Sequence, residues 1–232
     1  MIVITLNKYT VKVKAILLCC LLSISCMLKA TDKPIIKIET DGTSLIFQVG
    51  DNGRLYQRYL GKKLNHESDF AYLPQGTEVY ITHGAEDYFE PAIQVLHNDG
   101  NPSLLLKYVE HSSSRQNDGS VETVITLKDD KYPVTVKLHY ITYAAENIIK
   151  TFTEISHQEK KPVVLSKYAS SMLHFNRDKY FLTEFSGDWA HEVNIAEREL
   201  AFGKKTIDTK LGARANMFVS PFFQLSLGAP SK

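Results

Sequence analysis

From residue 31 onward the chain is built of short runs in which apolar and polar positions alternate, the pattern of half-buried β-strands. The clearest run lies at 134–140, where apolar residues occupy every second position and polar residues fill the positions between them. Similar runs, rich in β-branched and aromatic residues, predict strands at 43–49, 54–60, 121–127, 147–155 and 163–173. Residues 192–200 have the composition of a helix, but their apolar spacing is irregular, and we expect an extended segment.

Turn residues separate these runs. Asn52-Gly53 lies between two of the expected strands, which is a strong signal for a β-hairpin. Asn-Asp-Gly at 98–100 and at 117–119 marks later turns in the same way. Many short strands joined by such turns predict an all-β sandwich or barrel rather than βαβ units. No internal repeat or low-complexity linker is present, so we expect one domain over residues 31–232.

The first thirty residues have a different character. Lys8, Lys12 and Lys14 precede an apolar stretch at 15–27 that is short for a membrane span. This pattern predicts a signal peptide over residues 1–30, with cleavage after Ala30, and a periplasmic or secreted protein. An uncleaved membrane anchor is the alternative. Cys26 follows a poor version of a lipid-attachment motif, so a lipid anchor at Cys26 is a weak further possibility.

Composition and charge exclude several function classes. The chain has 232 residues, of which 44% are hydrophobic, enough to bury a sizeable core. The formal net charge is +1, and it becomes −3 without residues 1–30, which argues against a nucleic-acid partner. All three cysteines lie at positions 19, 20 and 26. The predicted mature domain therefore has no disulfide, thiolate metal site or cysteine nucleophile.

Motifs for common catalytic and cofactor sites are absent. The sequence has no GxGxxG, phosphate loop, GxSxG or HExxH. His191-Glu192 begins like the zinc motif, but Ile195 stands where the second histidine would be required. The other histidines show no ligand spacing, and His139 falls on the polar face of its expected strand. We therefore expect no metal and no cofactor, with each histidine solvated or hydrogen-bonded.

Candidate chemistry concentrates around the single tryptophan. Asp188 and Glu192 flank Trp189, and paired carboxylates next to a sugar-stacking aromatic are typical of glycosidases. The favoured alternative is a surface loop with solvated acids, so no catalytic residue is assigned. Trp189 itself is interpreted as a sugar contact or, with equal weight, as a core residue. Arg214 could bind a hydroxyl or carboxylate, although a structural salt bridge is the preferred interpretation.

Several phrases in order along the chain carry a family resemblance. They are the hairpin ending Tyr59-Leu60-Gly61-Lys62, the stretch around Pro91-Ala92, and Ser186-Gly187-Asp188-Trp189 with the residues up to Phe223. Together they resemble the N-terminal β-sandwich of family 36 glycoside hydrolases, the microbial α-galactosidases. One departure is the stretch 212–222, which lacks the Ser-Ser-His that the family often has there.

The resemblance implies a large antiparallel sandwich, called a supersandwich, that precedes a (β/α)8 catalytic barrel. It implies an enzyme that hydrolyses terminal α-galactosides such as melibiose and raffinose with retention and without a metal. The chain as given stops before a barrel, so we expect an accessory domain that helps shape the sugar pocket and the assembly. The resemblance assigns sugar contact to Trp189, and more weakly to Asp188, Glu192 and Asp69.

The partners expected from this resemblance are an α-galactoside, the protein's own barrel where the chain continues, and further copies of the chain. Two other functions stay open at this point. One is a stand-alone carbohydrate-binding module of the cell envelope, and the other is a structural or partner-binding sandwich. The first predicts sugar affinity that depends on Trp189, and the second predicts a stable oligomer without sugar binding.

Overall fold

The protein is described here by a computed structural model covering residues 33–85, 89–177, 179–208 and 218–230. This part is almost entirely antiparallel β-sheet, with one short 3-10 helix and no α-helix. None of its helices has the length and hydropathy required to cross a bilayer. The chain forms two compact units, 1–173 and 174–232, which are treated separately below. The signal peptide and its boundary at Ala30 lie outside the described residues and stay predictions.

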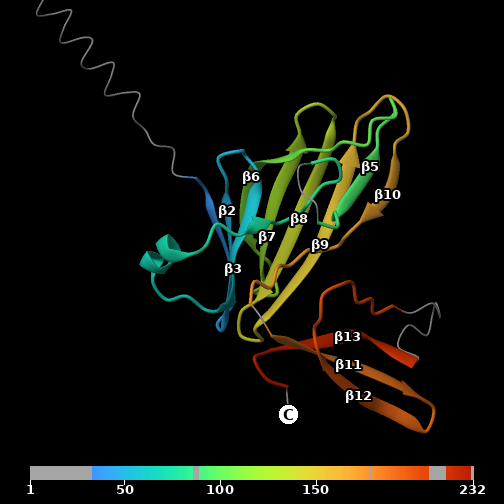
Figure 1. The fold of residues 1–232 in the computed structure, drawn as a ribbon. Helices are drawn as coiled ribbons and strands as arrows, with labels where there is room; N and C mark the ends of the chain where they lie inside the picture. Colours follow the sequence, from blue (N-terminus) through green and yellow to red (C-terminus); the bar gives the residue numbers. More distant parts are fainter. Residues whose placement is uncertain (1–32, 86–88, 178, 209–217, 231–232) are drawn as a thin grey trace, which may run out of the picture. The chain divides into compact units, whose positions relative to one another are not determined.

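Two four-stranded sheets form the first unit (Figure 1). The first has the order β1-β2-β3-β4, with bounds Ile35–Glu39, Thr43–Val49, Leu55–Lys62 and Thr77–Glu78. The second has the order β6-β7-β8-β9, with bounds Leu106–Arg115, Val121–Asp129, Val134–Tyr143 and Ile148–His157. A small two-stranded sheet pairs β5 (Ile93–Leu96) with β10 (Val164–Tyr168). The 3-10 helix η1 (Glu67–Tyr72) lies between β3 and β4.

The core of the first unit lies between the two larger sheets. Along β8 every second residue from Val134 to Tyr140 is buried, as the alternation in the sequence predicts. The first sheet buries side chains of β1 and β2 in the same cluster, and the rings of Phe47 and Tyr140 are 5.1 Å apart at their centroids. Apolar faces of two sheets that share one core define a β-sandwich, so the predicted fold class is confirmed.

The hairpins follow the turn residues of the sequence. Gly53, with φ of +78°, ends the turn between β2 and β3, and Gly119, with φ of +85°, lies in the turn between β6 and β7. A positive φ favours glycine because a side chain would collide with the backbone. In the second turn Asp118 Oδ1 accepts hydrogen bonds from the backbone N–H and the hydroxyl of Ser120, at 3.0 and 2.6 Å. The predicted Asn-Gly and Asn-Asp-Gly turns are therefore present.

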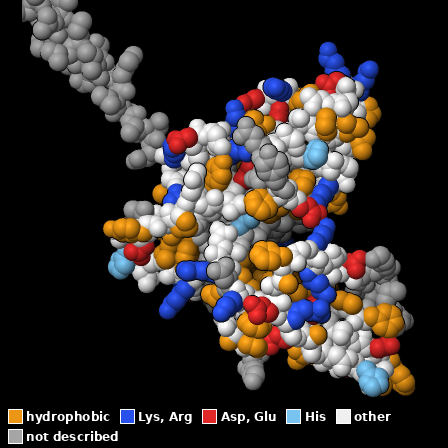
Figure 2. Space-filling model, viewed as in Figure 1, with side chains coloured by type: hydrophobic (Ala, Val, Ile, Leu, Met, Phe, Trp, Pro, Cys, Tyr) orange, Lys and Arg blue, Asp and Glu red, His pale blue; other side chains and the backbone are white. Residues whose placement is uncertain are grey.

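The second unit is one three-stranded antiparallel sheet with the order β12-β11-β13. Its strands are β11 (Tyr180–Asp188), β12 (His191–Glu199) and β13 (Phe218–Leu227). β12 confirms the extended segment expected at 192–200. Hydrophobic side chains remain at the surface of this sheet and its connections (Figure 2), among them Val193, Ile195, Phe202, Phe222, Phe223 and Leu227. So small a sheet has too little apolar area to cover these side chains by itself.

Candidate functional site

The tryptophan lies at the tip of the β11–β12 hairpin. Asp188 and His191 are paired across the two strands, so Trp189 and Ala190 form the connecting turn. Ala190 has a φ of +63°, and Asp188 Oδ1 accepts a hydrogen bond from the Trp189 backbone N–H at 2.7 Å. The indole is 88% exposed, which rejects the interpretation of Trp189 as a core residue. The exposed indole ring offers a large apolar surface to the solvent, of the kind that binds the apolar face of a sugar ring.

Gly187 shapes the base of this turn. The pairing of β11 with β12 shifts register between Ser186 and Asp188, and Val193 on the other strand has a φ of +57°. A Cβ at Gly187 would lie 3.0 Å from the backbone nitrogen of Val193, which is tighter than most real Cβ contacts. Glycine therefore relieves a tight contact at the bulge, which lies directly before the tryptophan turn.

The two carboxylates next to the tryptophan are both exposed. Asp188 shares a sheet face with its partner His191, and Glu192 follows His191 on the strand. Glu192 lies where the register of the two strands shifts, so regular alternation does not set the direction of its side chain relative to Asp188. Their assignment to sugar contact stays a prediction.

The remaining two candidates lie apart from the tryptophan turn in the chain. Asp69 is part of η1, in the other compact unit. Arg214 lies in 209–217, outside the described residues, and its role stays a prediction. No group of three or more metal-binding side chains is found within the described ranges. The imidazole of His139 is half-buried, with Nδ1 at 2.9 Å from a carboxylate oxygen of Glu122 and the ring stacked on Phe152.

The segment that carries η1, residues 63–76, is anchored at both ends, and we call it the anchored loop. At its start the backbone N–H of Lys63 donates to Gly42 O at 2.9 Å, and that of Leu64 donates to Ser44 Oγ at 3.1 Å. At its end the guanidinium of Arg58 donates to three oxygens, which are the backbone carbonyls of Leu73 and Pro74 and the side chain of Gln48. Tyr72 is 87% exposed on this loop.

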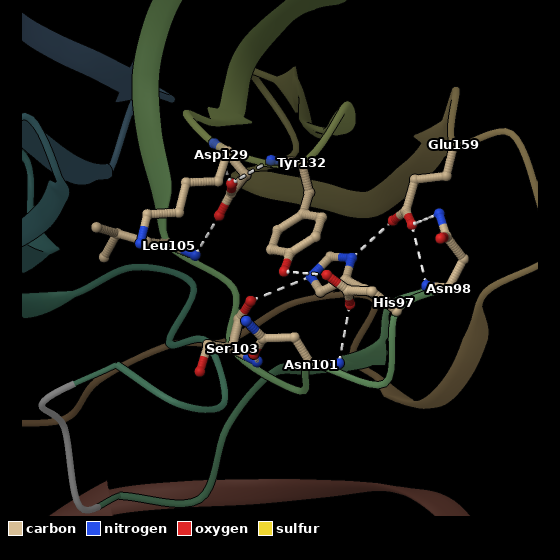
Figure 3. A network of polar contacts seen from close by, with 10 residues as sticks. His97, Asn98, Asn101, Ser103, Leu105, Asp129, Tyr132 and Glu159 are labelled. Atoms are coloured by element: carbon tan, nitrogen blue, oxygen red, sulfur yellow. Dashed lines mark hydrogen bonds and ion pairs between the residues drawn. The ribbon is translucent and has the colours of Figure 1, made fainter.

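A cluster of polar side chains around His97 joins three connections of the first unit (Figure 3). His97 follows β5, and its side chain is fully buried together with that of Glu159, from the connection between β9 and β10. Nδ1 of the imidazole lies 2.6 Å from Glu159 Oε1, and Nε2 lies 3.1 Å from the carbonyl oxygen of Ser103. A carbonyl oxygen can only accept, so Nε2 carries a proton, and a second proton is held between Nδ1 and Oε1.

The same cluster fixes a tyrosine. The Tyr132 ring stacks on the His97 ring with a centroid distance of 3.5 Å and an angle of 8°. Its hydroxyl donates to Asp99 at 2.9 Å, and burial together with this carboxylate raises the pKa of Tyr132. Asp129 accepts from the backbone N–H groups of Leu105, Lys131 and Tyr132, at 2.5, 2.7 and 2.8 Å. Side chains of each connection therefore contact the other one, and these contacts join residues 97–105 to residues 129–132.

Sequence reasoning missed this cluster and the anchoring role of Arg58. His97 and Glu159 are 62 residues apart, so their spacing carries no ligand or ion-pair signal. The only signal was local: Asn98-Asp99-Gly100 predicted a turn next to His97, without indicating what the turn would contact.

The ion pair predicts a pH dependence of stability. Burial raises the pKa of Glu159, but hydrogen bonds from His97 and from the backbone and side chain of Asn98 outweigh it and hold this pKa below its usual range. A lowered pKa in the folded state contributes stability that is present above the unfolded value, about pH 4, and is lost as pH falls through the folded value.

The difference in unfolding free energy between the wild type and Glu159→Gln should therefore shrink as the pH falls below about 4. Urea unfolding at a series of pH values measures it. A difference that grows toward acid pH would contradict the assignment of an ionised Glu159.

A cavity of about 520 Å³ adjoins this cluster. It is lined by Leu104, Leu105, Ala85 and Tyr132 on its apolar side, and its polar lining includes Asn52, Arg54, Asn101, Ser103, Asp129, Asp130 and Lys131. Its volume lies within the range of small-molecule sites.

Comparisons with known proteins show the family to which this chain belongs. Residues 53–230 match the family model described as the glycosyl hydrolase family 36 N-terminal domain. Among curated proteins, the α-galactosidase Mel36A of Lactobacillus acidophilus is 21% identical over 217 residues, which are 78% of this chain and 30% of the relative.

Solved structures show the same fold. An α-galactosidase from Lactobacillus brevis superposes with a TM-score of 0.73 at 22% identity, covering 84% of this chain and 31% of that one. A variant of the α-galactosidase AgaA from Geobacillus stearothermophilus, in complex with raffinose, gives 0.74 at 20% identity, with 83% and 31% covered. The chain thus spans just under a third of the length of these relatives.

Proposed function

The chain belongs to glycosyl hydrolase family 36 through its N-terminal domain, and we propose from this that it is the non-catalytic front domain of a secreted α-galactosidase. The match over residues 53–230 carries the proposal. The substrates would be terminal α-galactosides of the melibiose and raffinose type, in line with the raffinose and stachyose complexes of the Geobacillus relative. Hydrolysis would belong to a (β/α)8 barrel where the chain continues.

The surface of the second unit supports a role within a larger protein. Phe222, Phe223 and Leu227 of β13 are each more than half exposed, as are Val193 and Ile195 of β12. Exposed apolar residues gathered on one small sheet mark an interaction surface. We propose that the barrel of the same protein, or a further copy of the chain in a homo-oligomer, covers them. The basic and apolar start of the chain supports a periplasmic or secreted location.

The exposed tryptophan favours a second property, sugar binding by the domain itself. An indole that is 88% exposed at a turn fixed by Gly187 and Asp188 is preorganised for stacking on a sugar ring. In this proposal Trp189 supplies the contact surface. Asp188, Glu192, Asp69 and Arg214 are secondary contributors to the sugar pocket. A stand-alone carbohydrate-binding domain would use the same side chain in the same way.

Trp189→Ala is expected to weaken binding of raffinose and melibiose about fivefold, because stacking of an aromatic ring contributes on the order of 1 kcal/mol. Isothermal titration calorimetry on the purified chain measures the affinity. Phe202→Ala is the matched control, since Phe202 is another fully exposed aromatic of the same unit outside the hairpin. Equal affinity of the wild type and Trp189→Ala would remove Trp189 from the site.

A separate experiment tests whether hydrolysis requires the barrel. The purified chain is expected to release no nitrophenol from an aryl α-galactoside, whereas the same chain extended by the barrel from its coding locus should do so. Hydrolysis by the chain alone would contradict the assignment of catalysis to the barrel, whatever the calorimetry shows.

A further inference from the structure

The cavity next to the His97 cluster has the mixed lining that a sugar requires. One part of its wall is apolar and is formed by Leu104, Leu105, Ala85 and the Tyr132 ring. The other part carries hydroxyl, amide and charged groups from three separate connections of the first unit. Sugars present C–H groups on one side of the ring and hydroxyl groups around its edge, so both kinds of wall find a complementary surface.

The walls of the cavity are fixed before any ligand arrives. Figure 3 shows the Tyr132 ring stacked on His97. The Tyr132 hydroxyl also donates a hydrogen bond to Asp99, so the ring is held at both ends. Asn101 Oδ1 accepts from the backbone N–H of Ser103 at 2.9 Å, which fixes the connection on the opposite side. A preformed site loses little conformational entropy on binding, so even a few hydrogen bonds can give measurable affinity.

The charges around the cavity are balanced and mostly engaged. The guanidinium of Arg54 pairs with Glu78 at 3.1 Å, and Asp130 pairs with Lys107. Asp129 already accepts three backbone hydrogen bonds. Neither sign of charge is left in excess, so the site favours a neutral ligand over a phosphate or a cation.

Two polar groups of the lining have no partner among the described residues. They are the hydroxyl of Ser103, which lies against Gly84, and the ammonium group of Lys131. Both can donate a hydrogen bond to a hydroxyl oxygen, and the serine can also accept one. They stand on opposite connections, at 97–105 and 129–132, and can contact two positions of one ligand.

We propose that this cavity is a second carbohydrate site, separate in the chain from the tryptophan turn, which binds a neutral mono- or disaccharide unit. The Tyr132 and Leu105 side contacts the apolar face of the sugar, and Ser103 and Lys131 bind its hydroxyl groups. The site belongs to the first unit alone and does not depend on Trp189.

Amide NMR titration of the full chain with galactose, melibiose and raffinose tests this site. Signals from residues 97–105 and 129–132 should shift with a common dissociation constant, in the wild type and equally in Trp189→Ala. The double variant Ser103→Ala/Lys131→Ala should raise that constant about tenfold, the loss expected for two hydrogen bonds to ligand. Both substitutions leave every hydrogen bond of the His97 cluster in place, so an unchanged melting temperature is the folding control.

Each outcome of the titration decides the proposal. Shifts confined to the β11–β12 hairpin would overturn the second site and leave the proposed function intact. Shifts in the cavity that persist without Trp189 would support the second site, even if the tryptophan turn binds nothing. Equal affinity of the double variant would overturn the roles of Ser103 and Lys131. Saturation by inorganic phosphate but by none of the sugars would overturn the neutral ligand.

Discussion

Glu159→Ala is expected to lower the free energy of unfolding of the first unit by about 1–3 kcal/mol, because it leaves the buried imidazole of His97 without its hydrogen-bond partner. The side chains of His97 and Glu159 are 0% and 2% exposed, so water cannot replace the missing carboxylate. The variant also removes the acceptor for the backbone and side-chain N–H groups of Asn98. Urea unfolding followed by circular dichroism at pH 7 measures the change.

Two controls distinguish the effect of breaking the buried pair on stability from the effect of removing any charged side chain. Lys137→Ala removes an exposed ion pair with Glu154 at 3.5 Å, and it should change stability by less than about 1 kcal/mol. The double variant His97→Leu/Glu159→Leu removes both partners and should recover part of the loss, since neither side chain is then a buried polar group without a hydrogen bond. A loss in Glu159→Ala no larger than in Lys137→Ala would show that the pair does not hold the three connections together.

Gly76→Ala is expected to cost about 2–5 kcal/mol, for two reasons that add. Gly76 has a φ of +82°, which a residue with a side chain adopts at a cost of about 1–2 kcal/mol. The new Cβ would also lie 2.0 Å from the carbonyl oxygen of Gln57, and backbone cannot yield as a flexible side chain can. Relieving that overlap separates β4 from β3, where Gln57 pairs with Thr77, and releases the end of the anchored loop.

Gly100→Ala provides the matched control for this prediction. Gly100 has a φ of +86°, but a Cβ there would meet nothing within 4 Å. It therefore carries the backbone strain alone, and the difference between the two variants isolates the collision, about 1–3 kcal/mol. Limited proteolysis should cut residues 63–76 faster in Gly76→Ala only. Equal losses of stability in both variants would mean that Gln57 moves away at little cost.

The sandwich could be predicted from the sequence because its signals are local. Alternation at 134–140 assigns one face of β8 to the core, and Asn52-Gly53 specifies the turn between β2 and β3 whatever surrounds it. The order of short family phrases pointed to the same fold. The helix η1 had no such signal, because a single 3-10 turn is too short to show a hydrophobic period.

The candidate site was predictable only in part. The sequence placed a tryptophan among turn residues but left open whether it was buried, since an aromatic residue suits a core and a sugar site equally well. Its exposure at the turn between Asp188 and His191 was decided by strand register, in which the bulge at Gly187 sets the position of the turn. The sequence could not show how Asp188 and Glu192 lie relative to each other, because that also depends on register.

What the sequence determined by itself is the strand pattern, the turn positions and the family, because each is written in neighbouring residues or in short phrases kept in order. What only the tertiary structure decided is which distant residues meet. His97 finds Glu159 across 62 residues, Arg58 reaches the carbonyls of the anchored loop, and Tyr132 covers the His97 ring. Such contacts arise when separate connections are brought together by the packing of the sheets, and no spacing along the chain encodes the distance between them.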